Sequence, residues 1–122
     1  MVININQFTI VDCTFESNKA TSNGGALYIS GGLVTVENCT FTTNNATSNG
    51  GAIYWSGHSG TLNTSTFINN IAKGQSHDVY NAAGDLTIVK NHFTAFYLDE
   101  IGNVLLGYNA TEVLKSLLLM KI

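Results

Sequence analysis

Residues 13–28 read CTFESNKATSNGGALY and residues 39–54 read CTFTTNNATSNGGAIY, so the second segment repeats the first after 26 positions without a gap. Twelve of the sixteen positions are identical. Self-similarity at one fixed period is the sequence signature of a solenoid, in which each repeat buries its apolar face only against its neighbours. The repeat therefore predicts the architecture before any single residue is considered.

Alignment of four copies gives columns of similar residues, and their spacing predicts short strands. Two apolar columns, which begin at Phe8 and Ile10, lie two residues apart, as one face of a strand requires. The next apolar column begins at Cys13, three residues after Ile10, so the apolar residues move from even to odd positions. A change of parity predicts a bend, and polar residues suited to a corner stand there: Asp12, Asn38, Thr64 and Lys90.

Each predicted coil also contains a Phe column, a polar connection with a conserved spacing of Asn, and a Gly-Gly turn into a third strand. Asn tolerates left-handed backbone angles and can bond to its copies above and below, which predicts an internal amide ladder. Paired glycines allow the chain to turn tightly. The residues assigned to these ladders and turns are Phe15, Phe41, Phe67, Phe93, Asn18, Asn44, Asn70, Gly24, Gly25, Gly50 and Gly51.

No segment between residues 8 and 100 shows apolar residues at helical spacing, which excludes helical and leucine-rich repeats. The sequence therefore predicts an all-β fold: a right-handed parallel β-helix over residues 1–108, with three short strands in each 26-residue coil and about four coils. Residues 109–122 carry no turn signals. We expect them to cover the last coil as a short helical cap, and the alternative is a ragged final coil.

The composition excludes several classes of function. Charged residues are 11% of the chain, there are five Lys and no Arg, and the net charge is −3. This argues against nucleic acid as a partner, because binding to it depends on neutralising phosphates. The chain has no apolar run long enough for a membrane span and no signal-peptide pattern at its start.

The two cysteines, Cys13 and Cys39, stand one period apart. Neighbouring coils would place their Cα atoms about 4.8 Å apart, which is within disulfide range. We favour a buried stack of free thiols over a disulfide, since Ser65 and Asn91 continue the column as small polar residues.

The pairing of Phe-x-x-Asn (15–18, 41–44, 67–70) with Gly-Gly-Ala-Leu/Ile (24–27, 50–53) resembles the repeats of chlamydial polymorphic outer membrane proteins and of adhesin-like surface proteins. The resemblance covers residues 8–100 and decays after two coils: in the fourth copy Phe96 replaces the Asn and 100–103 replaces the Gly-Gly segment. It implies a non-catalytic module for display and adhesion at the cell surface or outside the cell. Its partner would be a host-cell or matrix protein or a glycan, and end-to-end self-association is a further expectation.

An aromatic column supplies the candidate contact surface: Tyr28, Tyr54, Trp55 and Tyr80. If the preceding apolar residues face inward, these aromatic side chains face outward, where they can bind sugars or proteins. The alternative is an ordinary cross-strand stack.

Other chemistry receives less support. We expect no enzyme, cofactor or metal site: a degenerate polysaccharide lyase or hydrolase would need clustered carboxylates, and the neighbouring acids Asp12 and Glu37 have no acidic copies in the next coils. His77-Asp78 is read as a turn that has lost its glycines, because a zinc site needs three or four converging ligands. Two outward Thr columns, beginning at Thr9 and Thr14, raise ice binding as a remote alternative, but they fall on different predicted sheets.

Overall fold

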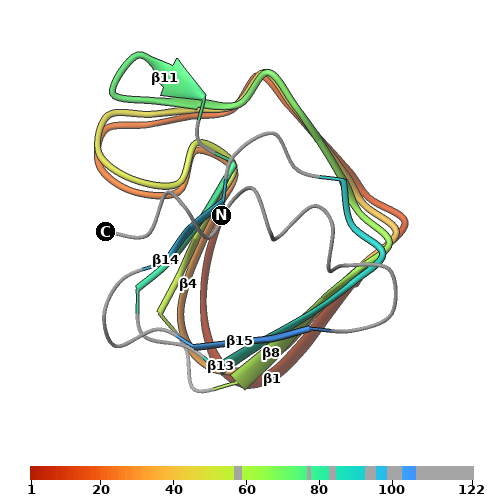
Figure 1. The fold of residues 1–122 in the computed structure, drawn as a ribbon. Helices are drawn as coiled ribbons and strands as arrows, with labels where there is room; N and C mark the ends of the chain where they lie inside the picture. The colour runs from red at the N-terminus through yellow and green to blue at the C-terminus, as the bar shows by residue number, and fades with distance from the viewer. Residues whose placement is uncertain (57–58, 77, 83–84, 93–95, 99–102, 107–122) are drawn as a thin grey trace.

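The chain forms a parallel β-solenoid in a computed structural model that describes residues 1–56, 59–76, 78–82, 85–92, 96–98 and 103–106. Viewed along the solenoid axis, successive coils lie on one another around a common core, and a loop projects from one side (Figure 1). The strands are β1 (Val2–Val11), β2 (Thr14–Glu16), β3 (Lys19–Ala20), β4 (Leu27–Glu37), β5 (Thr40–Thr42), β6 (Asn45–Ala46), β7 (Ile53–Trp55), β8 (Ser59–Asn63), β9 (Thr66–Ile68), β10 (Ile71–Ala72), β11 (Gln75–Ser76), β12 (Val79–Asn81), β13 (Asp85–Val89), β14 (Phe96–Leu98) and β15 (Asn103–Leu106).

The strands form three sheets. An eight-stranded sheet has the order β14-β12-β7-β4-β8-β13-β15, with β1 paired to β4. The other two sheets have the orders β2-β5-β9 and β11-β10-β6-β3. Strand β4 is longer than predicted, because the third strand of one coil continues without a break into the first strand of the next and pairs with both β7 and β8.

The 26-residue offset holds in the pairing of the first three coils, as in Phe15↔Phe41 and Phe41↔Phe67. The prediction for the fourth coil is wrong. Phe96 does not stand in the Asn column, since it pairs with Val79, 17 residues earlier. Asn103 does not lie in the Gly-Gly position, since it pairs with Asp85, 18 residues earlier. The last coil thus omits most of the polar connection, so its strands return to the sheet sooner.

The polar connection is more ordered than predicted. It contains the two-residue parallel strands β3, β6 and β10. In the third coil it also folds back as an antiparallel pair, β10 with β11, around Lys73 and Gly74, which have φ values of 54° and 73°. These left-handed angles are those of a tight hairpin turn.

The predicted corners are confirmed in the backbone angles. Asp12, Asn38, Thr64 and Lys90 all have positive φ, between 51° and 57°. A second set of left-handed residues was predicted at the Asn column but lies one residue earlier, at Ser17, Thr43 and Asn69 (φ 56–58°). This placement turns the following Asn side chain into the core.

The predicted amide ladder is confirmed. The Oδ1 atom of Asn44 accepts hydrogen bonds from the backbone N and the Nδ2 of Asn18, both at 3.0 Å. The Oδ1 atom of Asn70 accepts the same two bonds from Asn44, at 3.0 and 2.9 Å. The Nδ2 atoms of Asn44 and Asn70 also donate to the previous coil, to the carbonyl of Phe15 at 3.0 Å and to that of Phe41 at 2.9 Å. Asn44 and Asn70 are buried and Asn18, in the first coil, is exposed.

The Phe rings stack in the core with centroids 4.9 Å (Phe15–Phe41) and 4.8 Å (Phe41–Phe67) apart. Phe93 lies outside the described residues, as do 109–122 and hence the predicted cap. Both cysteines are free thiols, as favoured, but only Cys39 is buried and Cys13 is exposed. None of the described residues forms a helix that is long and apolar enough to cross a membrane.

Candidate functional site: a tyrosine groove

Three tyrosines form a stacked wall on the outside of the solenoid. Tyr28 pairs in register with Tyr54, and Tyr54 with Tyr80. Their ring centroids are 5.1 and 5.5 Å apart, with interplanar angles of 9° and 5°. The residues before them, Leu27, Ile53 and Val79, are fully buried, so the strand alternation directs the tyrosines outward as predicted. Tyr28 and Tyr54 are half-buried, but Tyr80 is buried, with 7% exposed, so the prediction that Tyr80 forms part of an exposed contact surface is wrong.

Trp55 was predicted to join this surface, and that prediction is wrong. The side chain is completely buried. It stands in register with Ile29 and Asn81, both buried, one residue after the tyrosine column, so strand alternation directs it into the core. Register also extends the tyrosine column to a position that the sequence reasoning missed: Tyr97 in β14 pairs with Tyr80. The repeated pattern of an apolar residue followed by Tyr could have identified it.

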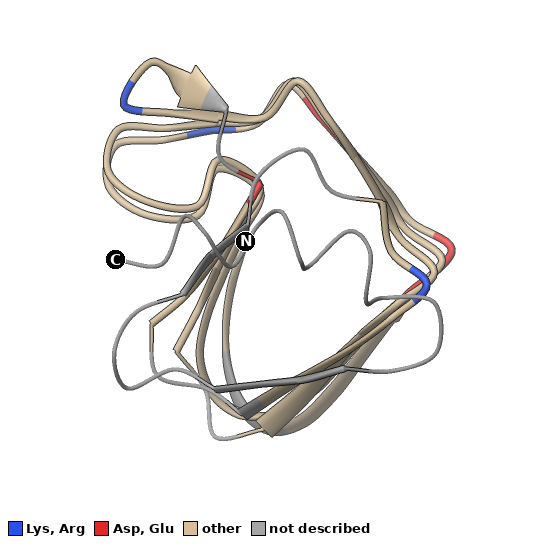
Figure 2. Ribbon diagram, viewed as in Figure 1, with Lys and Arg blue, Asp and Glu red and all other residues tan. Residues whose placement is uncertain are grey.

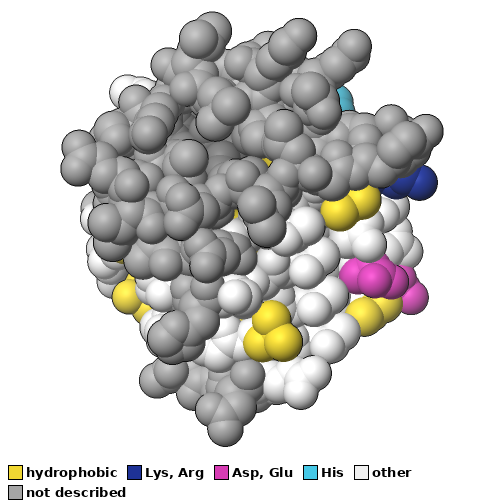
Figure 3. Space-filling model, turned by 60° about the horizontal axis from the view of Figure 1, so that its bottom comes forward, with side chains coloured by type: hydrophobic (Ala, Val, Ile, Leu, Met, Phe, Trp, Pro, Cys, Tyr) yellow, Lys and Arg dark blue, Asp and Glu magenta, His cyan; other side chains and the backbone are white. Residues whose placement is uncertain are grey.

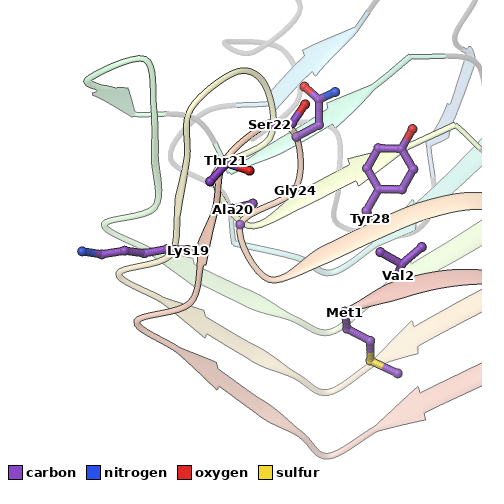
Figure 4. A pocket seen from close by; sticks show the side chains of 10 residues that line it. Met1, Val2, Lys19, Ala20, Thr21, Ser22, Gly24 and Tyr28 are labelled. Carbon is purple, nitrogen blue, oxygen red and sulfur yellow. The ribbon is translucent and has the colours of Figure 1, made fainter.

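A pocket of about 500 Å³ lies beside Tyr28 (Figure 4). Its other wall is the segment Lys19–Gly25, here called the polar arm, which belongs to the loop that projects in Figure 1. Met1 and Val2 complete the lining. We call this pocket the tyrosine groove. Thr21, Ser22 and Lys19 are exposed in it, so it combines one aromatic side chain with several polar groups.

The polar arm is held in place by its copy in the next coil. The backbone N of Asn49 donates to Oδ1 of Asn23 at 3.0 Å, and the N of Gly24 donates to the carbonyl of Asn49 at 2.9 Å. Gly24 has a φ of 70°, which disfavours other residues. A Cβ on Gly25 would overlap the carbonyl oxygen of Gly51, so the two coils approach as closely as they do only because a glycine stands here.

The groove carries little charge besides the amino group of Met1, which donates to the carbonyl of Ala26 at 2.8 Å. Lys19 is the one charged side chain among the residues that line it. Elsewhere the charged residues are few and lie mainly at the turns (Figure 2). The face that contains β1, β4, β8 and β13 is mostly uncharged, with acidic side chains at its edge (Figure 3). Its Thr column is confirmed by the pairs Thr9↔Thr35 and Thr35↔Thr61, and the second Thr column lies on another sheet, as predicted.

The candidates for acid–base or metal chemistry, His77-Asp78 and the other histidines, are dispersed where the structure describes them. Asp78 is buried and its Oδ1 accepts a hydrogen bond of 3.1 Å from Nδ2 of Asn70, so it meets the amide ladder in the core. His77 and His58 lie outside the described residues, and His92 is exposed. Within the part of the chain that is described, no three His, Cys, Asp or Glu side chains gather as metal ligands would.

A second hollow, of about 600 Å³, lies at the outer end of the first coil. Its lining is mostly apolar and includes Phe8, Ile10 and Phe15. Exposed Met1, Val2 and Val11 adjoin this end of the solenoid. End-to-end association through it stays a prediction.

The fold and the groove define a parallel β-solenoid with an aromatic-walled pocket on its side. The family model described as "Right handed beta helix region" matches residues 2–110. The chain therefore belongs to the right-handed β-helix family, which confirms the predicted fold and its handedness. Comparison with curated proteins and with solved structures found no match.

Proposed function

We propose that this chain is a non-catalytic binding module that presents the tyrosine groove to a glycan, at a cell surface or outside the cell. The observation that carries the proposal is the pairing of the Tyr28 side chain with the polar arm across one pocket. Sugars offer flat apolar ring faces and a rim of hydroxyl groups. An aromatic side chain matches the first, and amide and hydroxyl groups match the second.

The stacked arrangement supports a binding role for Tyr28 in particular. Tyr28 is held against Tyr54 and its ring orientation is therefore fixed before a ligand arrives. A preorganised side chain loses little conformational freedom on binding, which favours affinity. Tyr80 is mostly covered, so it supports the stack and contributes less contact surface.

The repeated motifs support display as the purpose of the fold. Phe-x-x-Asn supplies the ring stack and the amide ladder, and Gly-Gly supplies the close contact between coils. These residues are therefore occupied by the architecture, and the outward residues are left for recognition. The resemblance to polymorphic outer membrane and adhesin-like proteins, drawn from the same motifs, extends this proposal to adhesion.

The test is binding of the purified chain to an array of neutral and acidic glycans, followed by titration of the best ligand. Tyr28→Ser should weaken binding by about tenfold or more, because it removes the aromatic contact. Thr61→Ser is the matched control: this half-buried residue lies in β8, away from the groove, and its variant should bind as the parent does. Circular dichroism should show the same fold in all three proteins.

Two results would contradict the proposal. Equal binding by the parent and Tyr28→Ser would remove the tyrosine groove as the contact surface. Shortened glycan products after incubation with the parent chain would instead identify an enzyme, and the carbohydrate-active alternative would replace ours.

A further inference from the structure

The thiols of Cys13 and Cys39 lie in equivalent places on adjacent coils. Cys13 Sγ donates to the carbonyl of Val11 at 3.2 Å, and Cys39 Sγ donates to the carbonyl of Glu37 at 3.3 Å. The backbone N of Thr40 donates to the carbonyl of Cys13 at 3.0 Å, which keeps the two coils in register here. The side chains therefore leave the backbone in the same direction, one coil apart.

This arrangement comes close to the geometry of a disulfide. Paired strands lie about 4.8 Å apart, which is within the Cα separation that disulfides span. The Cβ atoms of a disulfide are about 3.8 Å apart, so the coils must approach by roughly 1 Å at this point. The first coil has room to adjust, because Cys13 is exposed and lines the open hollow at the outer end of the solenoid.

We propose that Cys13 and Cys39 form an intramolecular disulfide when the folded chain meets a low-molecular-weight disulfide such as oxidised glutathione. The exposed Cys13 thiolate attacks the oxidant, giving a mixed disulfide and one glutathione thiolate. The Cys39 thiolate then attacks the Cys13 sulfur and displaces the second glutathione thiolate. In sum, two protein thiols are oxidised, one oxidised glutathione is reduced, and both thiol protons pass to glutathione.

The bond would fasten the first coil, whose phenylalanines are only partly buried, to the second coil. Phe8 and Phe15 in the first coil are only partly buried, whereas Phe41 in the second is completely buried. Asn18 is exposed and Asn44 is buried. The first coil therefore has fewer contacts to oppose its detachment, and a covalent link at position 13 would limit local opening.

The test uses the full chain, folded and reduced, then incubated with oxidised glutathione. Free thiols are alkylated, the protein is unfolded and trypsin is added. Cleavage after Lys19 and Lys73 places Cys13 in fragment 1–19 and Cys39 in fragment 20–73. We expect most of the monomer to lose two hydrogen atoms, and the two fragments to travel as one species that a reductant separates.

Cys39→Ser is the matched variant, because the same column already holds Ser65, whose Oγ donates to the carbonyl of Asn63 at 3.1 Å. It should fold and give no linked fragments. Three results with the parent chain would overturn the proposal: both thiols still free, glutathione retained on Cys13, or dimers joined through Cys13. Unfolded parent chain that forms the link while folded chain does not would overturn it as well.

Discussion

The indole of Trp55 fills the space that a side chain at position 60 would occupy. A Cβ atom built on Gly60 would come 2.7 Å from Cε2 of Trp55 and closer still to Cζ2. Gly60 pairs with Val34 in the coil before and with Leu86 in the coil after. One large and one small residue thus replace Ile29 and Val34, which fill the equivalent places 26 residues earlier, in β4.

This exchange predicts strong coupling between the two positions. Gly60→Val alone should destabilise the chain by about 1–3 kcal/mol or more, because the core is overpacked. Trp55→Ile alone should cost about 2–5 kcal/mol through the cavity that it leaves. The double variant restores the Ile and Val pair found in β4, so it should be more stable than the sum of the two losses predicts. Urea unfolding followed by circular dichroism measures all four proteins.

The coupling should amount to about 0.5–3 kcal/mol in favour of the double variant. Trp55 Nε1 is buried with no hydrogen-bond partner among the described residues, so loss of the indole also removes an unsatisfied donor, which reduces the cost of Trp55→Ile. Strictly additive losses would show that the two side chains do not compete for one space.

The amide ladder should make Asn44 one of the most sensitive polar positions. Its side chain accepts from Asn18 and donates to Asn70 and to the carbonyl of Phe15. Asn44→Ala removes the partner of the Asn18 amide, of Oδ1 of Asn70 and of the Phe15 carbonyl. Each such loss costs about 1–3 kcal/mol when the group is buried. We expect a loss of about 2–4 kcal/mol in the free energy of unfolding, read from the urea midpoint.

The neighbouring Asn45 provides the comparison, since it is exposed and is the first residue of the strand that follows, β6. Asn45→Ala should change the free energy of unfolding by no more than about 0.5 kcal/mol. Similar losses from both variants would mean that the ladder adds nothing beyond the loss of a polar residue.

The corner at Thr64 offers a stabilising change. Its φ of 51° lies in the left-handed region, which β-branched residues rarely adopt. Asn38 holds the same corner in the second coil, with a φ of 52°, and Asn tolerates this region. Thr64→Asn should therefore raise the free energy of unfolding by about 0.5–1 kcal/mol, and the thermal midpoint should rise with it.

Thr66→Asn, two residues later in strand β9, makes the same substitution where the backbone is extended. It should lower the midpoint, because Asn is disfavoured in strands. Equal effects at the two positions would show that the backbone angle at the corner is not the cause.

The sequence was sufficient to predict the structure of the coils that repeat the coil before them. The change of parity located Asp12 and its copies, and the Phe-x-x-Asn spacing located the ladder, because an in-register stack forces identical residues into identical environments. The inward direction of Trp55 was predictable as well, because it follows Tyr54 and shares the column of Ile29. Repetition could not show the space that its indole fills, since that space depends on Gly60, five residues away on a strand that faces the same core.

The last coil shows the same limit. Once the motif decays, the 26-residue period no longer fixes the register, and pairing follows the apolar pattern instead: Val104 pairs with Leu86 and Leu106 with Ile88. The groove was not predicted either, because one of its walls is an outward-facing strand residue and the other is the projecting polar arm. Only the path of the chain through space brings Thr21 and Tyr28 to one pocket.

The Cys39 thiol should make stability depend on pH in the alkaline range. Burial is the main cause that raises its pKa in the folded chain above the ordinary value of 9.0, and hydrogen bonding to the backbone of Cys13 and Glu37 only partly opposes it. The folded state therefore retains the proton at a pH where the unfolded state has lost it. The contribution to stability is fully present below pH 9.0 and is lost as pH rises through the folded-state pKa.

The measurement is the urea midpoint of the reduced parent chain and of Cys39→Ser at pH 7.5 and pH 10.5. Tyr and Lys titrate in the same range, but they do so in both proteins, so the comparison isolates position 39. The midpoint of the parent should fall further between the two pH values than that of the variant, because serine has no proton to lose there. An equal fall in both proteins would contradict the prediction, because it would mean that the thiol ionises as readily in the folded chain as in the unfolded one.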